Sequence, residues 1–134
     1  MKKNLILSIH LQYANGIVRG QKTVELRRKF PLFKETDRKK IFIYACSPVS
    51  KIIGKCDLID VQKIPIKKLW NITRSLAKID EISFQKYFIN CDFGFALYLT
   101  NPLEYKEPIS LKKLFGMNIY PPQSYRYVCE NMIA

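Results

Sequence analysis

Gly20-Gln21-Lys22-Thr23-Val24-Glu25-Leu26-Arg27-Arg28 contains the change from helix to strand that organises the first part of this chain. Residues 10–19 before it have the apolar spacing of an amphipathic helix, and the glycine that follows them predicts the end of that helix. The next residues alternate with the period of a strand. Glu25 and Arg27 therefore share one face of the predicted strand, and Lys22 lies at its entrance.

The remaining sequence predicts short strands interrupted by small helices. We predict strands at residues 4–9, 41–45, 51–64 and 93–100, with a bulge or bend at Gly54. We predict helices from Pro65 through Ile72, at residues 82–88 and at residues 111–115. The tail, residues 120–128, is expected to be ordered, with Tyr127 and Val128 in the core. This pattern lacks strand–helix alternation and favours one compact α+β, barrel-like domain over residues 1–134.

Composition excludes several classes of protein. With 48% apolar and 13% aromatic residues, the chain can bury a core, and no run approaches the ~20 apolar residues of a membrane span. We therefore expect a cytoplasmic protein with no membrane partner. The single histidine and the irregular cysteine spacing predict free, buried thiols, with no zinc site and no disulfide framework. The cysteines are Cys46, Cys56, Cys91 and Cys129. We expect no metal and no cofactor.

Positive charge is concentrated in the first part of the chain. The formal net charge is +12, and residues 1–55 hold 13 Lys/Arg against 3 Asp/Glu, whereas residues 56–134 hold 10 against 8. A positive field focused on one region suits a polyanion, because bound phosphates release counterions. A lysine-rich proteome is the alternative explanation.

Lys22, Glu25 and Arg27 are the first candidates for a site. A carboxylate between an ammonium and a guanidinium stays ionised and is held in position. Such a set can orient a base edge, since Glu accepts from an exocyclic amine while Arg and Lys bind phosphate or carbonyl oxygens. A structural ion pair on the strand surface is the alternative.

The spacing Gly20-x-Lys22-x-x-Glu25-x-Arg27 resembles the G-x-K-x-x-E-x-R signature of the ASCH family, which is related to the PUA domain. The likeness covers nearly the whole chain. It includes the opening residues 7–20, Tyr44-Ala45-Cys46-Ser47-Pro48 and the closing Pro121-Pro122-Gln123-Ser124-Tyr125-Arg126-Tyr127, which fits one bacterial branch.

This resemblance implies a PUA-like (ASCH) β-barrel with flanking short helices and a cleft at the strand that carries the signature. Family members are thought to bind RNA, and a few hydrolyse RNA or acetylated cytidine. We expect the tail and the Ser47 turn to reach the cleft, because amide, hydroxyl, aromatic and cationic groups can hold an unstacked base and its phosphate. The predicted nucleic-acid-binding residues are Lys22, Glu25, Arg27, Arg28, Ser47, Gln123, Ser124, Tyr125 and Arg126.

Three functions follow from these residues. The first is a non-catalytic RNA-binding domain, a coregulator or RNA-processing module, which we favour. The second is a metal-independent hydrolase of RNA or of a modified nucleoside, with Lys22 and Glu25 as the acid–base pair and with His10 near the cleft as a further candidate. In the deacetylating branch a threonine three residues after the lysine is the nucleophile, but Glu25 occupies that position here. The third is an interaction module that senses a nucleotide, a nucleoside or another small metabolite. The oligomeric state is not predicted.

Overall fold

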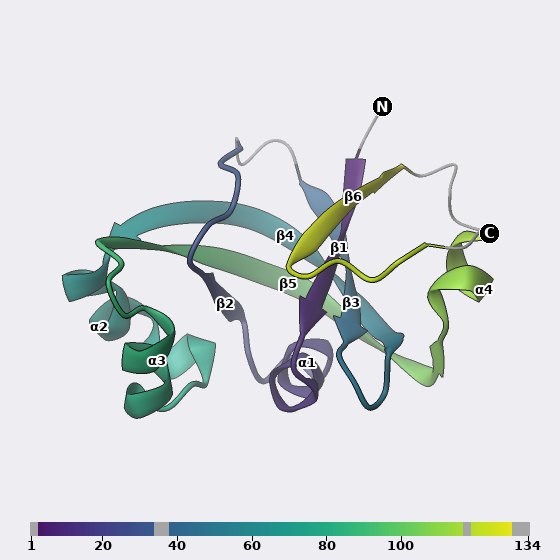
Figure 1. Cartoon of the computed structure of the whole chain (residues 1–134), viewed down its shortest axis with the longest axis horizontal. Helices are drawn as coiled ribbons and strands as arrows, with labels where there is room; N and C mark the ends of the chain where they lie inside the picture. The colour runs from purple at the N-terminus through teal and green to yellow at the C-terminus, as the bar shows by residue number, and fades with distance from the viewer. Residues whose placement is uncertain (1–2, 34–37, 117–118, 130–134) are drawn as a thin grey trace.

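The computed structural model describes residues 3–33, 38–116 and 119–129. Figure 1 shows a long curved sheet, with two helices at one end of it and one at the other. In chain order the elements are β1 (Lys3–Ile9), α1 (Leu11–Val18), β2 (Val24–Arg27), β3 (Lys39–Ala45), β4 (Lys51–Pro65), α2 (Ile66–Ala77), α3 (Glu81–Tyr87), β5 (Phe93–Ile109), α4 (Leu111–Phe115) and β6 (Tyr125–Cys129).

The strands form one six-stranded sheet in the order β2-β5-β4-β3-β1-β6. β1 and β3 are parallel, and the other neighbouring strands are antiparallel. The predicted α+β class is confirmed, but the sheet does not close into the predicted barrel. Within the described residues β2 pairs with β5 alone and β6 with β1 alone, so β2 and β6 are the two edges.

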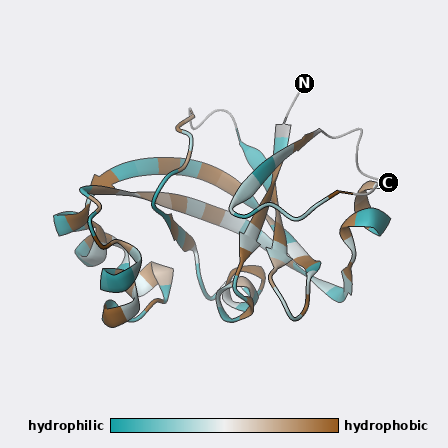
Figure 2. Cartoon of the chain, in the orientation of Figure 1, coloured by the Kyte–Doolittle hydropathy of each residue, from teal (hydrophilic) through white to brown (hydrophobic). Residues whose placement is uncertain are grey.

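Apolar residues pack on both faces of the sheet. One face carries the main cluster, with Leu7, Ile43 and Leu97 from three strands and Ile17 from α1. On the other face, α4 covers one end of the sheet, whereas α2 and α3 cover β2 and the neighbouring end of β5. Figure 2 shows the alternation of hydrophobic and hydrophilic residues along β4 and β5 that this arrangement requires.

Gly54 allows the sheet to bend around α1. The pairing register of β4 shifts on both sides of this residue, as the predicted bulge or bend requires. A Cβ at Gly54 would lie 2.3 Å from the carbonyl oxygen of Leu103 and 2.6 Å from a methyl of Val18. The missing side chain therefore lets α1 lie directly on the sheet.

The predicted helices and strands are present. Their observed ends differ from the predicted ones where pairing with a distant strand sets the end. β5 continues to Ile109 because its second half pairs with the start of β4. β2 is shorter than the predicted strand. Val128 is buried as predicted, but Tyr127 is 40% exposed, so its assignment to the core was wrong.

Within these same described residues, no helix is long and apolar enough to cross a membrane. Three cysteines carry free thiols: Cys56 is buried, and Cys46 and Cys91 are half-buried. Burial raises the pKa of the Cys56 thiol to about 12, so this thiol stays protonated. The predicted burial of Cys129 concerns a side chain outside the described structure.

Candidate functional site

The turn after α1 places Lys22. Gly20 adopts a left-handed conformation with φ of 76°, which glycine tolerates and which turns the chain back on the helix. The amides of Gln21 and Lys22 then both donate to the carbonyl oxygen of Gly16, at 2.9 and 3.0 Å. A Cβ at Gly16 would lie 3.3 Å from the Cβ of Lys22, so the two glycines together bring this lysine against α1.

The ammonium group of Lys22 is buried. Only 4% of the residue is exposed, and its Nζ donates to the carbonyl oxygen of Ala77 at the end of α2. Nζ also lies 3.4 Å from Oε1 of Glu25 and 5.2 Å from the centre of the Tyr13 ring. Burial lowers the pKa of Lys22, the Glu25 carboxylate partly opposes this effect, and Arg27 adds to it. Lys22 is therefore a buried cation that gives up a proton more readily than an ordinary lysine.

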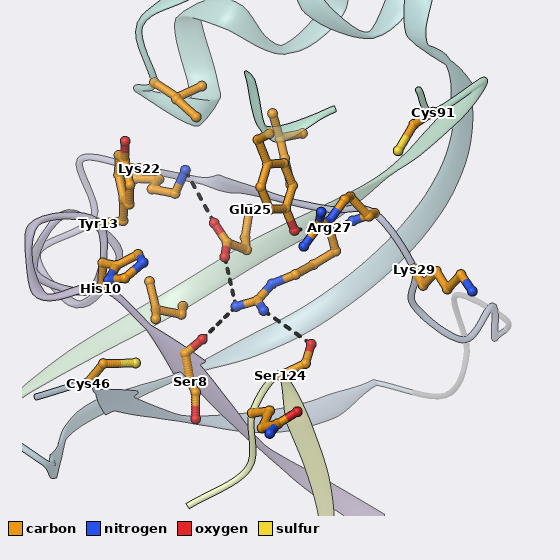
Figure 3. Close-up of a pocket in the computed structure, with 16 residues that line it drawn as sticks. Ser8, His10, Tyr13, Lys22, Glu25, Arg27, Lys29, Cys46, Cys91 and Ser124 are labelled. Carbon is orange, nitrogen blue, oxygen red and sulfur yellow. Dashed lines mark hydrogen bonds and ion pairs between the residues drawn. The ribbon is translucent and has the colours of Figure 1, made fainter. Parts of the chain in front are cut away.

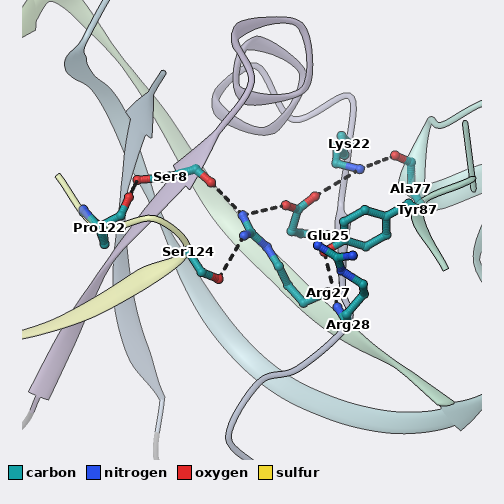
Figure 4. A network of polar contacts seen from close by, with 9 residues as sticks. All are labelled: Ser8, Lys22, Glu25, Arg27, Arg28, Ala77, Tyr87, Pro122 and Ser124. Atoms are coloured by element: carbon teal, nitrogen blue, oxygen red, sulfur yellow. Dashed lines mark hydrogen bonds and ion pairs between the residues drawn. The ribbon is translucent and has the colours of Figure 1, made fainter. Parts of the chain in front are cut away.

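Glu25 lies between two cations. Its second oxygen, Oε2, is 3.0 Å from Nη2 of Arg27. The Arg27 guanidinium also donates to the carbonyl oxygen of Ser8 at 2.9 Å and to Oγ of Ser124 at 3.2 Å (Figure 4). With both oxygens of Glu25 in ion pairs, the carboxylate holds the two cations in position.

Arg27 bridges the open edges of the sheet. It starts on β2, and its partners Ser8 and Ser124 lie at the end of β1 and just before β6. Ser8 in turn holds the tail, since its Oγ donates to the carbonyl oxygen of Pro122 at 2.6 Å and its amide to that of Ser124 at 2.9 Å. We call the side-chain bridge between β2 and the β1–β6 pair the Arg27 clasp. It stands where a closed barrel would have backbone pairing.

The Lys22–Glu25–Arg27 set lies in a cleft of about 790 Å³, which is within the usual range for small-molecule sites. Figure 3 shows the cleft between β2, the end of β1 and the tail. Its lining residues are Ser8, Ile9, His10, Tyr13, Lys22, Glu25, Leu26, Arg27, Arg28, Lys29, Cys46, Ile79, Tyr87, Cys91, Gln123 and Ser124.

The structure brings six of the nine predicted binding residues together in this cleft. They are Lys22, Glu25, Arg27, Arg28, Gln123 and Ser124. His10 also lines the cleft, at an exposed position where its side chain makes no capping hydrogen bond to α1. Each of these residues lies on β2 or within two residues of it, directly after β1, or in the tail before β6.

The other three predicted residues lie outside the cleft lining. Ser47 is exposed in the turn after β3, and the residue that faces the cleft there is its neighbour Cys46. The Tyr125 ring packs on Phe30 with 4.9 Å between ring centres, because the strand alternation turns it toward the core. Arg126 is exposed on β6.

Sequence reasoning missed several residues of the cleft, above all Tyr13 and Tyr87. The apolar spacing of residues 10–19 assigned Tyr13 to a packing face, and it does pack on the core, but its ring also faces Lys22. Tyr87 comes from α3, and no local pattern joins that helix to β2. Its hydroxyl accepts a hydrogen bond from the amide of Arg28 at 3.3 Å.

The charged side chains at the rim of the cleft that have no ion-pair partner among the described residues are positive. Arg28 and Lys29 are exposed at its edge, and neither forms an ion pair with any described residue. Lys22 has three donors, of which Glu25 and Ala77 occupy two. The described residues contain no cluster of three or more His, Cys, Asp or Glu side chains placed to hold a metal ion. The arrangement can therefore hold an anionic group with cations from its floor and its rim.

Comparison with known proteins agrees with this architecture. The ASCH domain family model matches residues 7–133. A relative named ASCH domain-containing ribonuclease, from Zymomonas mobilis, is 32% identical over 129 residues, which are 95% of this chain and 85% of that protein. A crystal structure of ASCH from Zymomonas mobilis superposes with a TM-score of 0.87 at 29% identity, covering 98% of this chain and 92% of that one.

A more distant structure shares the fold alone. The N-terminal domain of Staphylothermus marinus McrB superposes with a TM-score of 0.51 at 16% identity, over 86% of this chain and 80% of that domain.

The family match covers nearly the full length, and the signature residues Lys22, Glu25 and Arg27 meet in one buried network. The chain belongs to the ASCH domain family.

Proposed function

We propose that this protein binds single-stranded RNA in the Lys22 cleft and cleaves it there. The observation that carries the proposal is the buried lysine on the floor of a nucleotide-sized cleft whose rim cations, Arg28 and Lys29, have no anionic partner among the described residues. The relative named a ribonuclease supports an RNA substrate. Cleavage goes beyond our sequence prediction of non-catalytic binding, because Lys22, whose pKa is lowered by burial, and His10 line the same cleft.

The reaction would use the ribose of the substrate as nucleophile. The 2′-hydroxyl gives its proton to a base in the cleft and attacks the adjacent phosphorus, and the 5′-oxygen leaves with a proton from an acid. The products are a 2′,3′-cyclic phosphate and a 5′-hydroxyl. Lys22 and His10 are the two cleft residues suited to carry these protons, and the charge of Lys22 also stabilises the extra negative charge on the phosphorane. Glu25 and Arg27 position Lys22 in this scheme.

The test is an assay of a labelled single-stranded RNA with analysis of the product ends. We expect cyclic phosphate products, and we expect Lys22→Met and His10→Gln each to slow cleavage by about 100-fold, the usual size of a general acid–base contribution. His10 is exposed, so His10→Gln preserves the fold. Arg74→Gln on the exposed surface of α2 is the control. RNA with 2′-deoxy linkages should bind and stay intact.

Binding without cleavage is the second candidate function, and a specific observation favours it. Both oxygens of Glu25 are occupied, which removes one of the two proton carriers that the sequence predicted. RNA that binds to the wild-type protein and remains intact would support this candidate and reject the nuclease. No binding of any RNA would reject both.

Hydrolysis of a modified nucleoside draws less support from the geometry. Lys22 is present as the predicted base, but Thr23 is exposed and does not line the cleft.

A further inference from the structure

Arg28 and Tyr87 form a stacked pair at the edge of the cleft. The guanidinium carbon of Arg28 lies 4.8 Å from the centre of the Tyr87 ring, and the Tyr87 hydroxyl accepts a hydrogen bond from the Arg28 amide (Figure 4). A cation over a tyrosine ring at this distance is held by the negative face of the ring. The pair therefore fixes the direction of an arginine that would otherwise be free at the surface.

Tyr87 is a rigid support for this arginine. Its ring meets Phe88 edge-on with 4.8 Å between ring centres. Phe88 contacts Phe84 at 4.8 Å, and Phe84 contacts Trp70 at 5.2 Å, so a row of four aromatic rings joins the cleft edge to the core between α2 and α3. Phe84 and Phe88 are both buried.

The guanidinium of Arg28 has no other partner. Among the described residues it forms no ion pair and no side-chain hydrogen bond, although an arginine presents five N–H donors. Tyr87 covers one face of the guanidinium, and the residue remains exposed. A structural arginine would use its donors on the protein, as the preceding residue Arg27 does with Ser8, Ser124 and Glu25.

We propose that Arg28, held against Tyr87, is a stacking platform for an unpaired RNA base whose phosphate is bound by Lys22 and Lys29. This proposal rests on the proposed function and names the part of the RNA that the cleft recognises. Guanidinium planes and aromatic rings are the groups on which RNA-binding proteins stack splayed-out bases. A base in a duplex has both faces covered by its neighbours, so the platform selects single-stranded RNA.

The experiment compares two 2′-O-methyl oligonucleotides of equal length, one with bases and one abasic, by fluorescence anisotropy. The methyl group blocks cleavage, and both strands carry the same phosphates. We expect the wild-type protein to bind the base-bearing strand at least about 5-fold more tightly. This ratio corresponds to the lower end of the binding free energy that one base gains by stacking on one side chain. Arg28→Lys keeps the charge and removes the planar group, so it should bring this ratio close to one while affinity for the abasic strand is retained.

Tyr87 provides a second, independent variant. Tyr87→Phe keeps the ring and should preserve the ratio, whereas Tyr87→Leu should lower it. Arg74→Lys, the same substitution at an exposed position on α2, is the matched control and should leave the ratio unchanged. Thermal melts followed by circular dichroism identify any variant that does not fold, and Arg28 is exposed, so Arg28→Lys keeps the test valid if Tyr87→Leu unfolds.

Two results overturn the proposal, and they differ from failure of the proposed function. A base-to-abasic ratio near one in the wild-type protein would reject the platform and leave RNA binding intact. A ratio that survives Arg28→Lys would place the stacking elsewhere. Absence of binding to either strand by the wild-type protein would reject RNA binding and the platform together.

Discussion

At the scale of single residues, Glu25 is the centre of the site. It is 7% exposed and forms ion pairs with both Lys22 and Arg27. Removing one member of such a buried set leaves the other charges without compensation. The loss of folding free energy is then larger than the net contribution of the ion pair. Glu25 therefore makes the burial of two neighbouring cations tolerable.

Glu25→Gln tests this role through stability. We expect it to lower the free energy of unfolding by roughly 3 kcal/mol, because it leaves two cations close together without a carboxylate. Urea denaturation measures the change. Glu104→Gln is the matched control, since Glu104 pairs with Arg19 on the exposed surface and its loss should cost less than about 1 kcal/mol. Equal, small effects of the two substitutions would contradict the account.

Lys22 gives the stability a defined pH dependence. Burial lowers its folded-state pKa below 10.5, so between that lowered value and 10.5 the unfolded chain binds more protons than the folded one. The contribution of Lys22 to the free energy of unfolding must then rise with pH across this window. Below the window Lys22 is charged in both states, and its burial costs stability in full.

Lys22→Met isolates this effect from that of the other titrating groups. We expect the difference in unfolding free energy, wild type minus variant, to increase as the pH is raised from neutral toward 10.5. Urea denaturation of both proteins at several pH values gives the difference. A difference that is constant or falls with pH would show that burial does not lower the pKa of Lys22.

At the scale of elements, the Arg27 clasp joins two sheet edges that have no backbone pairing with each other among the described residues. β2 has only four residues and depends on β5 on its other side. The clasp is therefore expected to limit local opening of the cleft, which is a different property from the stability of the central β3–β4–β5 strands.

Arg27→Leu tests the clasp by hydrogen–deuterium exchange. Exchange should become faster in β2 and in the residues around Ser124, and it should stay unchanged in the pairing between β3 and β4. Arg19→Leu, which removes only an exposed ion pair, is the control. Uniformly faster exchange over the whole sheet would mean that Arg27 contributes to global stability and that no separate clasp exists.

The sequence was sufficient to predict those elements whose ends are set by capping residues close by in the chain. α4 spans residues 111–115 as predicted, since Ser110 caps its first turn and Gly116 ends it in a left-handed conformation. Contacts between segments far apart in the chain could not be predicted from the sequence. The extension of β5 to Ile109 depends on β4, and the arrival of Tyr87 at the cleft depends on how α3 packs. The alternation in β2 predicted the shared face of Glu25 and Arg27, whereas Lys22 reaches them through the Gly20 turn.

At the scale of the whole molecule, the excess of positive charge in residues 1–55 includes the lysine on the cleft floor and both cations at its rim. If Lys22 and Lys29 each bind a phosphate of single-stranded RNA, the logarithm of the affinity should fall with the logarithm of salt concentration with a slope of about −1.4. Lys29→Gln should reduce the size of that slope by about 0.7, and Arg74→Gln should not change it. A slope that is the same in all three proteins would place the phosphate contacts outside the cleft.

The central claim is that RNA enters the Lys22 cleft. The most direct measurement is a titration of ¹⁵N-labelled protein with a non-cleavable single-stranded RNA, followed by amide chemical shifts. We predict the largest changes at residues 8–10, 22–29 and 123–124, which line the cleft, with small changes on α4 at the far end of the sheet. Changes centred on α4 or on the exposed end of the β4–β5 pair, with none at Lys22 or Arg28, would contradict the claim.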